Sequence, residues 1–134
     1  MLFTRASEYA ILALIYIADK KEPQDVETMA EKLEISKSFL AKILQALAKD
    51  GLLISYKGAK GGFILSKDSK EYTLKDIVNS AEKKQVSIFE CSHGICPINK
   101  ESRCLMLPVL VQLQDTMNDH LSKITLFDII NKKN

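Results

Sequence analysis

Three cysteines and one histidine lie within fourteen positions of the sequence, in the segment CSHGICPINKESRC at residues 91–104. The chain has no other cysteine, and an odd number of thiols cannot pair off completely. Structural zinc sites combine four Cys or His ligands, so Cys91, His93, Cys96 and Cys104 could form a Cys3His site. Iron–sulfur clusters also take thiolates from one loop, and three thiols would leave one iron position to be filled from elsewhere. The segment therefore predicts metal binding or reactive-thiol chemistry, with packing as small apolar side chains as the structural alternative.

A catalytic role for a thiol would need a general base, and the two histidines of the chain, His93 and His120, are the candidates. No motif in the sequence supplies an oxyanion site or a substrate pocket. We therefore expect no enzyme, no catalytic residue and no small-molecule substrate.

The 134 residues suit one domain that can bury a core without disulfides. The apolar run from Tyr9 to Ala18 spans ten residues, about half of what a helix needs to cross a membrane. Arg5, Ser7 and Glu8 precede this run and no small-residue cleavage site follows it, so we expect no secretion leader. The prediction is a cytoplasmic protein without a membrane partner, in a compartment where thiols stay reduced.

Basic residues concentrate in one part of the chain. Positions 35–70 hold seven lysines against two aspartates, a local charge of +5, whereas the whole chain carries +2. A basic stretch of this kind favours a polyanionic partner such as nucleic acid. A lysine-rich face that contacts only water is the alternative.

The first half of the sequence predicts three helices and then a β-hairpin. Thr4 can cap a first helix over about 4–20, whose apolar middle predicts burial on every side. Asp25 can cap a short amphipathic helix, and Ser36 can cap a third helix that ends at Gly51. The apolar stripe of the third helix is Leu40, Ile43, Leu44 and Leu47. Two strand-like runs, 52–55 and 63–65, then flank the turn glycines 58, 61 and 62. This order of elements predicts a winged helix-turn-helix.

A fourth helix and an irregular loop should follow the hairpin. Thr73 and Asp76 form a capping box for a helix that reaches about Glu82. The loop from about 83 to 104 has neither a helical nor an alternating period. An irregular segment of this length inside a domain calls for a function or for something that orders it.

The last helix should run from near Pro108 to about Asn131. Apolar positions recur in it at steps of three and four, which predicts a partner helix from a second subunit or from the domain itself. The members of this seam are Leu110, Leu113, Met117, His120, Ile124 and Phe127.

The winged helix-turn-helix pattern places candidate DNA contacts in a helix and in the wing. The second helix of the motif enters the major groove with its N-terminal residues near base edges, and wing glycines let backbone and cations approach a narrow groove or the phosphates. No arginine in the reading helix can bind guanine bidentately, so specificity would depend on the wing, DNA shape and half-site spacing. The candidates are Ser36, Lys37, Ser38, Phe39 and Lys42 in the helix and Tyr56, Lys57 and Lys60 in the wing. A winged-helix module that contacts only proteins is the alternative.

Four stretches together resemble the Rrf-two superfamily of bacterial winged helix-turn-helix transcription regulators. They are LFTRASEYAILALIYIA, SKSFLAKILQALAKDGLLISYKGAKGGFILS, YTLKDIV and the three-cysteine loop. The resemblance covers nearly the whole chain, and it is to the iron–sulfur cluster-binding branch that includes the IscR and NsrR regulators. It implies a mainly α fold with a small β-wing and a long C-terminal dimerisation helix.

The resemblance also implies a division of the chain and a mode of action. Residues 1–82 would form the DNA-binding domain, 83–107 the cluster-binding loop and 108–134 the dimerisation helix. A homodimer would bind a two-fold symmetric operator in double-stranded DNA, as a repressor in the simplest case. Its binding would respond to redox state, nitric oxide, oxygen or cluster supply. A zinc site or redox-reactive thiols in place of a cluster are the alternative.

On the same analogy, Cys91, Cys96 and Cys104 ligate a 2Fe-2S or 4Fe-4S cluster. Some members of the family take a fourth ligand from a histidine shortly after the third cysteine, and this chain has none there. Others use a carboxylate early in the first helix of the partner subunit, and Glu8 occupies that position. Glu8 is therefore the expected fourth ligand and His93 the second choice, while a favourable interaction with the helix dipole is the structural alternative for Glu8. The cysteine spacing departs from the equal five-and-five spacing of the family, so the cluster type stays open.

Overall fold

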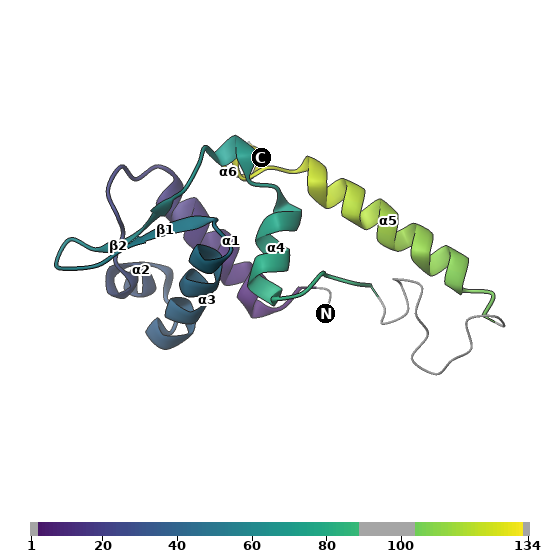
Figure 1. Ribbon diagram of the computed structural model, residues 1–134, viewed down its shortest axis with the longest axis horizontal. Coiled ribbons are helices and arrows are strands. Elements are labelled where there is room, and N and C mark those ends of the chain that lie inside the picture. The colour runs from purple at the N-terminus through teal and green to yellow at the C-terminus, as the bar shows by residue number, and fades with distance from the viewer. Residues whose placement is uncertain (1–2, 89–103, 133–134) are drawn as a thin grey trace.

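The computed structural model describes residues 3–88 and 104–132. The elements in chain order are α1 (Arg5–Ala18), α2 (Val26–Leu33), α3 (Lys37–Lys49), β1 (Leu53–Tyr56), β2 (Gly62–Leu65), the 3-10 helix η1 (Ser69–Glu71), α4 (Leu74–Glu82), α5 (Leu107–Lys123) and α6 (Leu126–Asn131). Helices α1–α4 and the β1–β2 hairpin form a head, α5 extends from it as an arm, and α6 returns to the head (Figure 1). The predicted mainly helical fold with a small wing is confirmed.

Local sequence signals set the ends of the first three helices. The Thr4 hydroxyl accepts a hydrogen bond from the Ala6 N–H (3.2 Å), and the Asp25 carboxylate accepts one from the Thr28 N–H (2.8 Å). Both bonds confirm the predicted N-caps. After α3, Gly51 has a φ of +83°, a left-handed conformation that glycine adopts at little cost. The predicted end of this helix is therefore confirmed as well.

A continuous apolar core holds the head together. The stripe predicted for α3, Leu40 to Leu47, is buried. Leu14 and Ile17 of α1 are fully buried, whereas Leu12 is 38% exposed. Helix α1 contacts α2, α3, α4, α6 and β2, and these elements leave the side that carries Leu12 open to solvent. The expectation that α1 is buried on every side is therefore not met in the single chain.

The wing is an antiparallel hairpin whose register pairs Leu53 with Leu65 and Tyr56 with Gly62. Two backbone hydrogen bonds attach the start of β2, next to the turn of the hairpin, to the segment between α1 and α2. The Gln24 N–H donates to the Phe63 carbonyl, and the Phe63 N–H donates to the Gln24 carbonyl, both at 2.9 Å. The outer part of β2 is thus fixed to the segment that leads into α2.

The C-terminal segment forms two helices, which corrects the prediction of one helix from about 108 to 131. Helix α5 ends at Lys123, and Thr125 caps α6. The Thr125 hydroxyl accepts from the Asp128 N–H (3.1 Å), and the Asp128 carboxylate accepts from the Thr125 N–H (3.0 Å). This capping box starts a new helix at a point where the apolar period alone would continue the old one.

Backbone hydrogen bonds from a distant part of the chain hold this break. The Leu74 N–H donates to the Ile124 carbonyl (2.7 Å), and the Leu126 N–H donates to the Tyr72 carbonyl (2.9 Å). The short segment between α5 and α6 thereby pairs with the residues that precede α4. The end of the arm is attached to the head at this bridge.

The buried face of α5 differs from the predicted seam. Leu110 is buried as expected, but Leu113 is 47% exposed and His120 is also exposed. The other buried positions of α5 are Gln114 and Leu121. The side of the arm that faces the head is therefore narrow and partly polar, and half of the predicted seam residues are exposed in the single chain. None of the helices in the described ranges is both long and apolar enough to cross a membrane.

Candidate functional site

The N-terminus of α3 presents two hydroxyls and a lysine to solvent. Ser36, Lys37 and Ser38 are all exposed. Ser36 occupies the predicted N-cap position, but its side chain makes no capping bond. Its hydroxyl oxygen lies 3.2 Å from that of Ser38 instead. Lys37 approaches Glu27 at 3.9 Å with both side chains largely in water, a contact worth little. These polar groups, at a helix N-terminus that favours anions, can bind an external partner.

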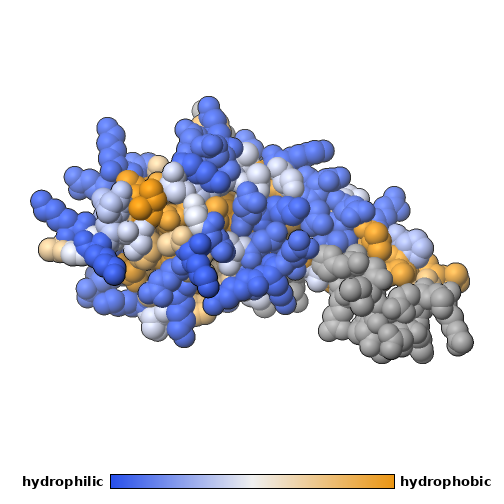
Figure 2. Space-filling model, viewed as in Figure 1, coloured by the Kyte–Doolittle hydropathy of each residue, from blue (hydrophilic) through white to orange (hydrophobic). Residues whose placement is uncertain are grey.

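Two further predicted contacts lie on the first turns of α3. Phe39 makes an edge-to-face contact with Tyr9 of α1, with ring centroids 5.6 Å apart, and yet stays 39% exposed. Its ring therefore both packs on α1 and remains accessible to a partner. Lys42 is exposed one turn further on. The head has a largely hydrophilic surface around these elements (Figure 2).

The wing carries the other predicted contacts, Tyr56, Lys57 and Lys60, all exposed. Tyr56 in particular leaves 51% of its surface open. The turn between the strands depends on glycine, because a Cβ atom at Gly61 would overlap the backbone carbonyl of Tyr56. At Gly62 a Cβ atom would overlap the Gln24 backbone. A tight turn therefore brings two lysines and an aromatic ring together at one end of the head.

Tyr72, which the sequence interpretation did not single out, fixes the other side of the wing. Its side chain is fully buried, and its hydroxyl donates to the Leu52 carbonyl at 2.5 Å. The same oxygen accepts from the Ser66 N–H at 2.9 Å, and the Ser66 hydroxyl donates to the Gly51 carbonyl at 2.6 Å. One buried phenol thus joins the end of β2 to the turn that leads from α3 into β1.

The described flank of the cysteine loop is fastened to α5 by Gln114, which is 2% exposed. Its amide nitrogen donates to the Val86 carbonyl (2.9 Å) and to the Asn118 side chain (3.1 Å). Its amide oxygen accepts from the Ile88 N–H (3.0 Å). The Asn79 side chain of α4 also accepts from the Val86 N–H (3.1 Å). Polar side chains therefore set where the loop leaves the head.

Glu82, the last residue of α4, ties the start of this loop to the start of α1. Its carboxylate accepts from the Ser7 hydroxyl (2.5 Å), the Thr4 hydroxyl (2.6 Å) and the Thr4 N–H (3.2 Å). Burial raises the pKa of Glu82, but these hydrogen bonds lower it by more, so the pKa lies below its ordinary value of 4.5. The charged carboxylate is thus the form that holds α1 and α4 together.

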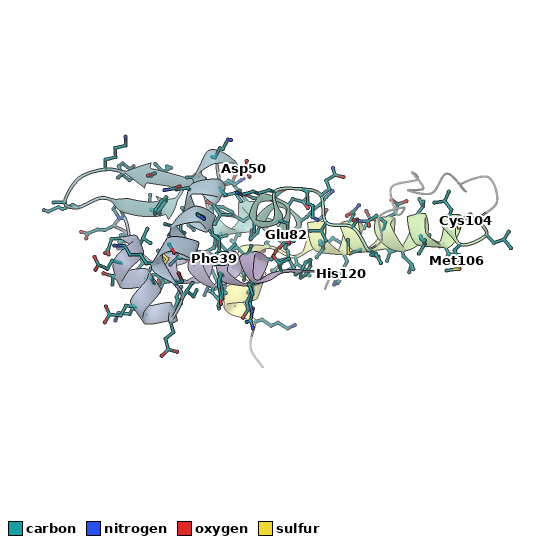
Figure 3. All side chains as sticks on the ribbon, turned by 90° about the horizontal axis from the view of Figure 1, so that it is seen from below. Phe39, Asp50, Glu82, Cys104, Met106 and His120 are labelled. Carbon is teal, nitrogen blue, oxygen red and sulfur yellow. The ribbon has the colours of Figure 1, made fainter. Side chains whose placement is uncertain are left out.

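The predicted cofactor ligands fall into three groups. Cys91, His93 and Cys96 lie outside the described residues. Cys104 is a free, half-buried thiol at the far end of the arm (Figure 3). Glu8 lies in the first turn of α1 and pairs with Arg5 at 3.1 Å, with 52% of its side chain exposed. The described ranges contain no cluster of three metal-ligating side chains.

Within one chain, the start of α1, which carries Glu8, lies near the middle of the molecule, whereas Cys104 lies at one end of it (Figures 1 and 3). The first turn of α1 is bonded to Glu82 in the head, while Cys104 lies beyond the outer end of α5 (Figure 3). A carboxylate from the same chain is therefore badly placed to share a site with this thiol.

Comparison with known proteins assigns the chain to a family. It matches the Rrf2 family, described as an iron-dependent transcriptional regulator, over residues 3–132. The chain belongs to the Rrf2 family. The resemblance based on the cysteine loop and the wing is thereby confirmed.

Relatives of this Rrf2 chain are regulators of transcription. It is 30% identical over 135 residues to the HTH-type transcriptional regulator IscR of Pectobacterium atrosepticum, a match that covers 99% of this chain and 81% of that protein. Its structure is similar to CymR, the global cysteine regulator of B. subtilis, with a TM-score of 0.73 and 22% identity over 98% of each chain. It is also similar to T. potens IscR, with a TM-score of 0.68 and 22% identity over 95% of this chain and 84% of that one. The two structures support the fold. The family match and the IscR relative show that the Rrf2 chain is a transcriptional regulator and not an enzyme.

The sequence interpretation missed the residues that position the Rrf2 wing and loop. Gln24, Tyr72 and Gln114 are uncharged, and only Tyr72 lies in one of the stretches that resemble the family, YTLKDIV. One signal was present for Gln114, because it is a polar residue next to the apolar seam of α5. No signal in the sequence indicated the partners of Tyr72, which are backbone groups of Leu52 and Ser66.

Proposed function

We propose that this Rrf2 chain is a homodimer that binds a two-fold symmetric operator and whose affinity depends on an iron–sulfur cluster. The observation that carries the DNA part is the exposed polar N-terminus of α3 beside a wing held in place by Gln24 and Tyr72. In a helix-turn-helix protein this helix enters the major groove. The local charge of +5 over positions 35–70 provides attraction for the phosphates.

Each exposed side chain has a role that its chemistry suits. The hydroxyls of Ser36 and Ser38 can bond phosphates or base edges, and the Phe39 ring can contact a thymine methyl. The remaining contacts, Lys37, Lys42, Tyr56, Lys57 and Lys60, would approach the backbone or a narrow groove. Residues 1–82 form the DNA-binding domain in this proposal.

The exposed side of the arm supports the proposed dimer. Met106, Val109 and Leu113 are 55%, 45% and 47% exposed, and apolar atoms gather towards the outer end of α5 (Figure 2). These residues recur at steps of three and four on one side of the helix, as expected for a surface that packs on another helix. In this proposal residues 108–134 form the dimerisation segment, and α5 of a second copy covers the arm.

The donor set of the loop supports a cluster. Cys91, Cys96 and Cys104 supply three soft thiolates, and a bound cluster would supply iron that responds to redox state and to small oxidants. Glu8 of the second subunit is the proposed fourth ligand, with His93 as the alternative. A carboxylate oxygen is a harder donor than thiolate, so this ligand should be the weakest. The iron-dependent description of the family and the similarity to IscR agree with this assignment.

The separation of Glu8 from Cys104 gives the proposal its mechanism. A loop of one subunit, residues 83–107, would be joined to α1 of the other, and α1 is bonded through Glu82 to the head. The spacing of the two reading heads would then depend on this junction. Half-sites about one helical turn apart, roughly 34 Å, leave little tolerance for a change in spacing.

The decisive experiment compares anaerobically purified, iron- and sulfide-reconstituted protein with its apo form on one operator, measured by fluorescence anisotropy. We expect different affinities, and a Cys104→Ser variant should bind like the apo form in both preparations. Glu8→Ala should keep the protein folded but speed the loss of absorbance in air, while Glu31→Ala on α2 serves as the control. Equal affinities of the two forms would refute the coupling.

The salt dependence of binding tests the DNA part on its own. If a dimer neutralises about six to ten phosphates, affinity should fall on the order of a thousandfold between 50 and 200 mM salt. A response that does not change with salt would favour the module that contacts only proteins.

The second candidate function is a regulator that uses a zinc site or a redox-reactive thiol in place of a cluster. It is favoured by the half-buried free thiol of Cys104. Iron, sulfide and zinc analysis of the anaerobic preparation separates these possibilities. A colourless preparation that takes up no iron and sulfide, but contains zinc or one fast-reacting thiol, would replace the cluster proposal with this one.

A further inference from the structure

A cleft between α3 and α4 is lined by three lysines, of which only Lys42 is among the DNA contacts proposed above. It has a volume of about 520 Å³, and Lys42 and Lys49 line it from α3 while Lys83 lines it from the end of α4. Asp50 is the acidic residue in the lining, so three lysines against one aspartate give the cleft a net charge of +2. A surface of this kind attracts anions.

The cations of the cleft are not neutralised by nearby carboxylates. Among the described residues, Lys42, Lys49 and Lys83 make no ion pair. The carboxylate of Asp50 already accepts a hydrogen bond from the Ser80 hydroxyl at 2.6 Å. The lysines of the cleft therefore keep their donors for a partner from outside.

Asn79 adds neutral donors to the same cleft. Its amide oxygen accepts from the Val86 N–H at 3.1 Å, so its NH2 group remains to donate. Ammonium groups are common phosphate ligands, and a phosphoryl group offers several acceptor oxygens to donors that surround it. A carboxylate would offer only two oxygens to this set.

We propose that the α3–α4 cleft binds a phosphoryl group. A phosphate bound there would bridge the reading helix, through Lys42 and Lys49, to the end of α4, through Lys83 and Asn79. Because Asn79 also holds Val86, the bound phosphate would connect the reading helix with the entrance of the cysteine loop. The phosphate can come from the DNA backbone beside a half-site or from a free phosphorylated molecule. The first of these sources rests on the DNA binding proposed above.

Two measurements with the full chain distinguish these sources. The test variant is Lys49→Gln combined with Lys83→Gln, and the control is Lys21→Gln combined with Lys123→Gln, which removes the same charge away from the cleft. In the first measurement, inorganic pyrophosphate is titrated into the DNA-free protein while NMR follows the amides of Ala46 and Asn79. In the second, operator affinity is measured over a range of salt concentrations.

A phosphate from DNA predicts that the slope of log affinity against log salt falls by about 1 for each lysine removed, hence by about 4 in the test variant, because both subunits of the dimer lose two lysines. A free phosphate predicts saturable NMR shifts that weaken at least fivefold in the test variant. Either result supports the cleft if the control variant behaves like the wild type. The proposal is overturned if neither effect appears, or if the control variant shows the same loss. Wild-type protein that binds no DNA would refute the proposed function, while the pyrophosphate titration would still decide on the cleft.

Discussion

The head and the α5 arm are built on different principles. The head encloses a continuous core in which Leu14, Leu40 and Leu44 are fully buried. In the arm, Leu110, Gln114 and Leu121 are buried, while a neighbouring row of apolar side chains remains exposed. The head is thus stabilised by hydrophobic burial within one chain. The arm is held near its middle by the hydrogen bonds of Gln114 and at its inner end by the bridge to the residues that precede α4.

This difference indicates where the molecule can change shape. Hydrophobic cores resist rearrangement because close packing transmits any change in volume. An arm held by a few hydrogen bonds can move when those bonds change. A signal from the cysteine loop would therefore act more easily on the arm than on the interior of the head.

The largest expected effect comes from a direct test of this contrast in the free energy of unfolding. Leu44→Ala in the head should lose about 3 kcal/mol, because it removes buried methyl groups and leaves a cavity. Leu113→Ala on the arm is the matched control, since the side chain is 47% exposed in the single chain. Its effect should be small and should depend on protein concentration if a second copy covers it. Urea denaturation at several concentrations measures both, and equal losses at every concentration would remove the contrast.

A polar joint inside the head should give the next largest effect. Tyr72→Phe keeps the buried ring but leaves the Leu52 carbonyl and the Ser66 N–H without their partner. We expect a loss of about 2 kcal/mol, the cost of unsatisfied buried groups, and weaker operator binding as the wing loosens. Tyr16→Phe is the control for the phenol, because Tyr16 is half-buried in α1 and is not a proposed DNA contact. In a double-mutant cycle, Tyr72→Phe and Lys60→Ala should show coupled losses of DNA affinity. Purely additive losses would mean that Tyr72 does not position the wing.

The head could be predicted from the sequence because its signals are local. Thr4, Asp25 and Gly51 each act within one turn of their own position, and the apolar stripe of α3 is contained in a single helix. The order of these elements then leaves few arrangements other than a winged helix-turn-helix. The resemblance to the Rrf2 family rests on the same stretches and was confirmed for the same reason.

The errors arose where distant residues compete with a local period. The seam of α5 continues in the sequence through Ile124, but hydrogen bonds to the segment before α4 end the helix there. The capping box of Thr125 and Asp128 was a local signal for the break, and the apolar repeat outweighed it. Ser36 shows a smaller error, because the residue type predicted a capping bond and its hydroxyl contacts Ser38 instead. The roles of Tyr72 and Gln114 depend on partners that only the folded chain brings near.

The polar attachment of the arm should give a smaller effect than the core or the wing joint. Gln114→Ala removes the partner of the Val86 carbonyl and the Ile88 N–H. Water can replace part of these bonds at the edge of the head, so we expect a loss of about 1 kcal/mol. Hydrogen exchange should become faster at residues 86–88, and Gln112→Ala on the exposed side of α5 should leave it unchanged. Unaltered exchange in the Gln114 variant would show that the arm is held by its inner end alone.

The smallest effect concerns the tie between α1 and α4, and it appears as a pH dependence. Because the pKa of Glu82 in the folded protein lies below its ordinary value of 4.5, the charged form stabilises the fold above that pH. This contribution disappears as the pH falls through the lowered pKa. The free energy of unfolding of Glu82→Gln should therefore be about 0.5 kcal/mol below that of the wild type at pH 7, a modest share of what hydrogen bonds to a charged group contribute. Near pH 3 the two free energies should be more nearly equal. Thermal unfolding from pH 3 to pH 7 measures the difference, with Glu31→Gln as an exposed control. The difference in stability between Glu82→Gln and the wild type could instead be constant over this pH range. The hydrogen bonds from the hydroxyls of Thr4 and Ser7 would then not depend on the charge of the carboxylate. The start of α1 would be held by packing, as the rest of the head is.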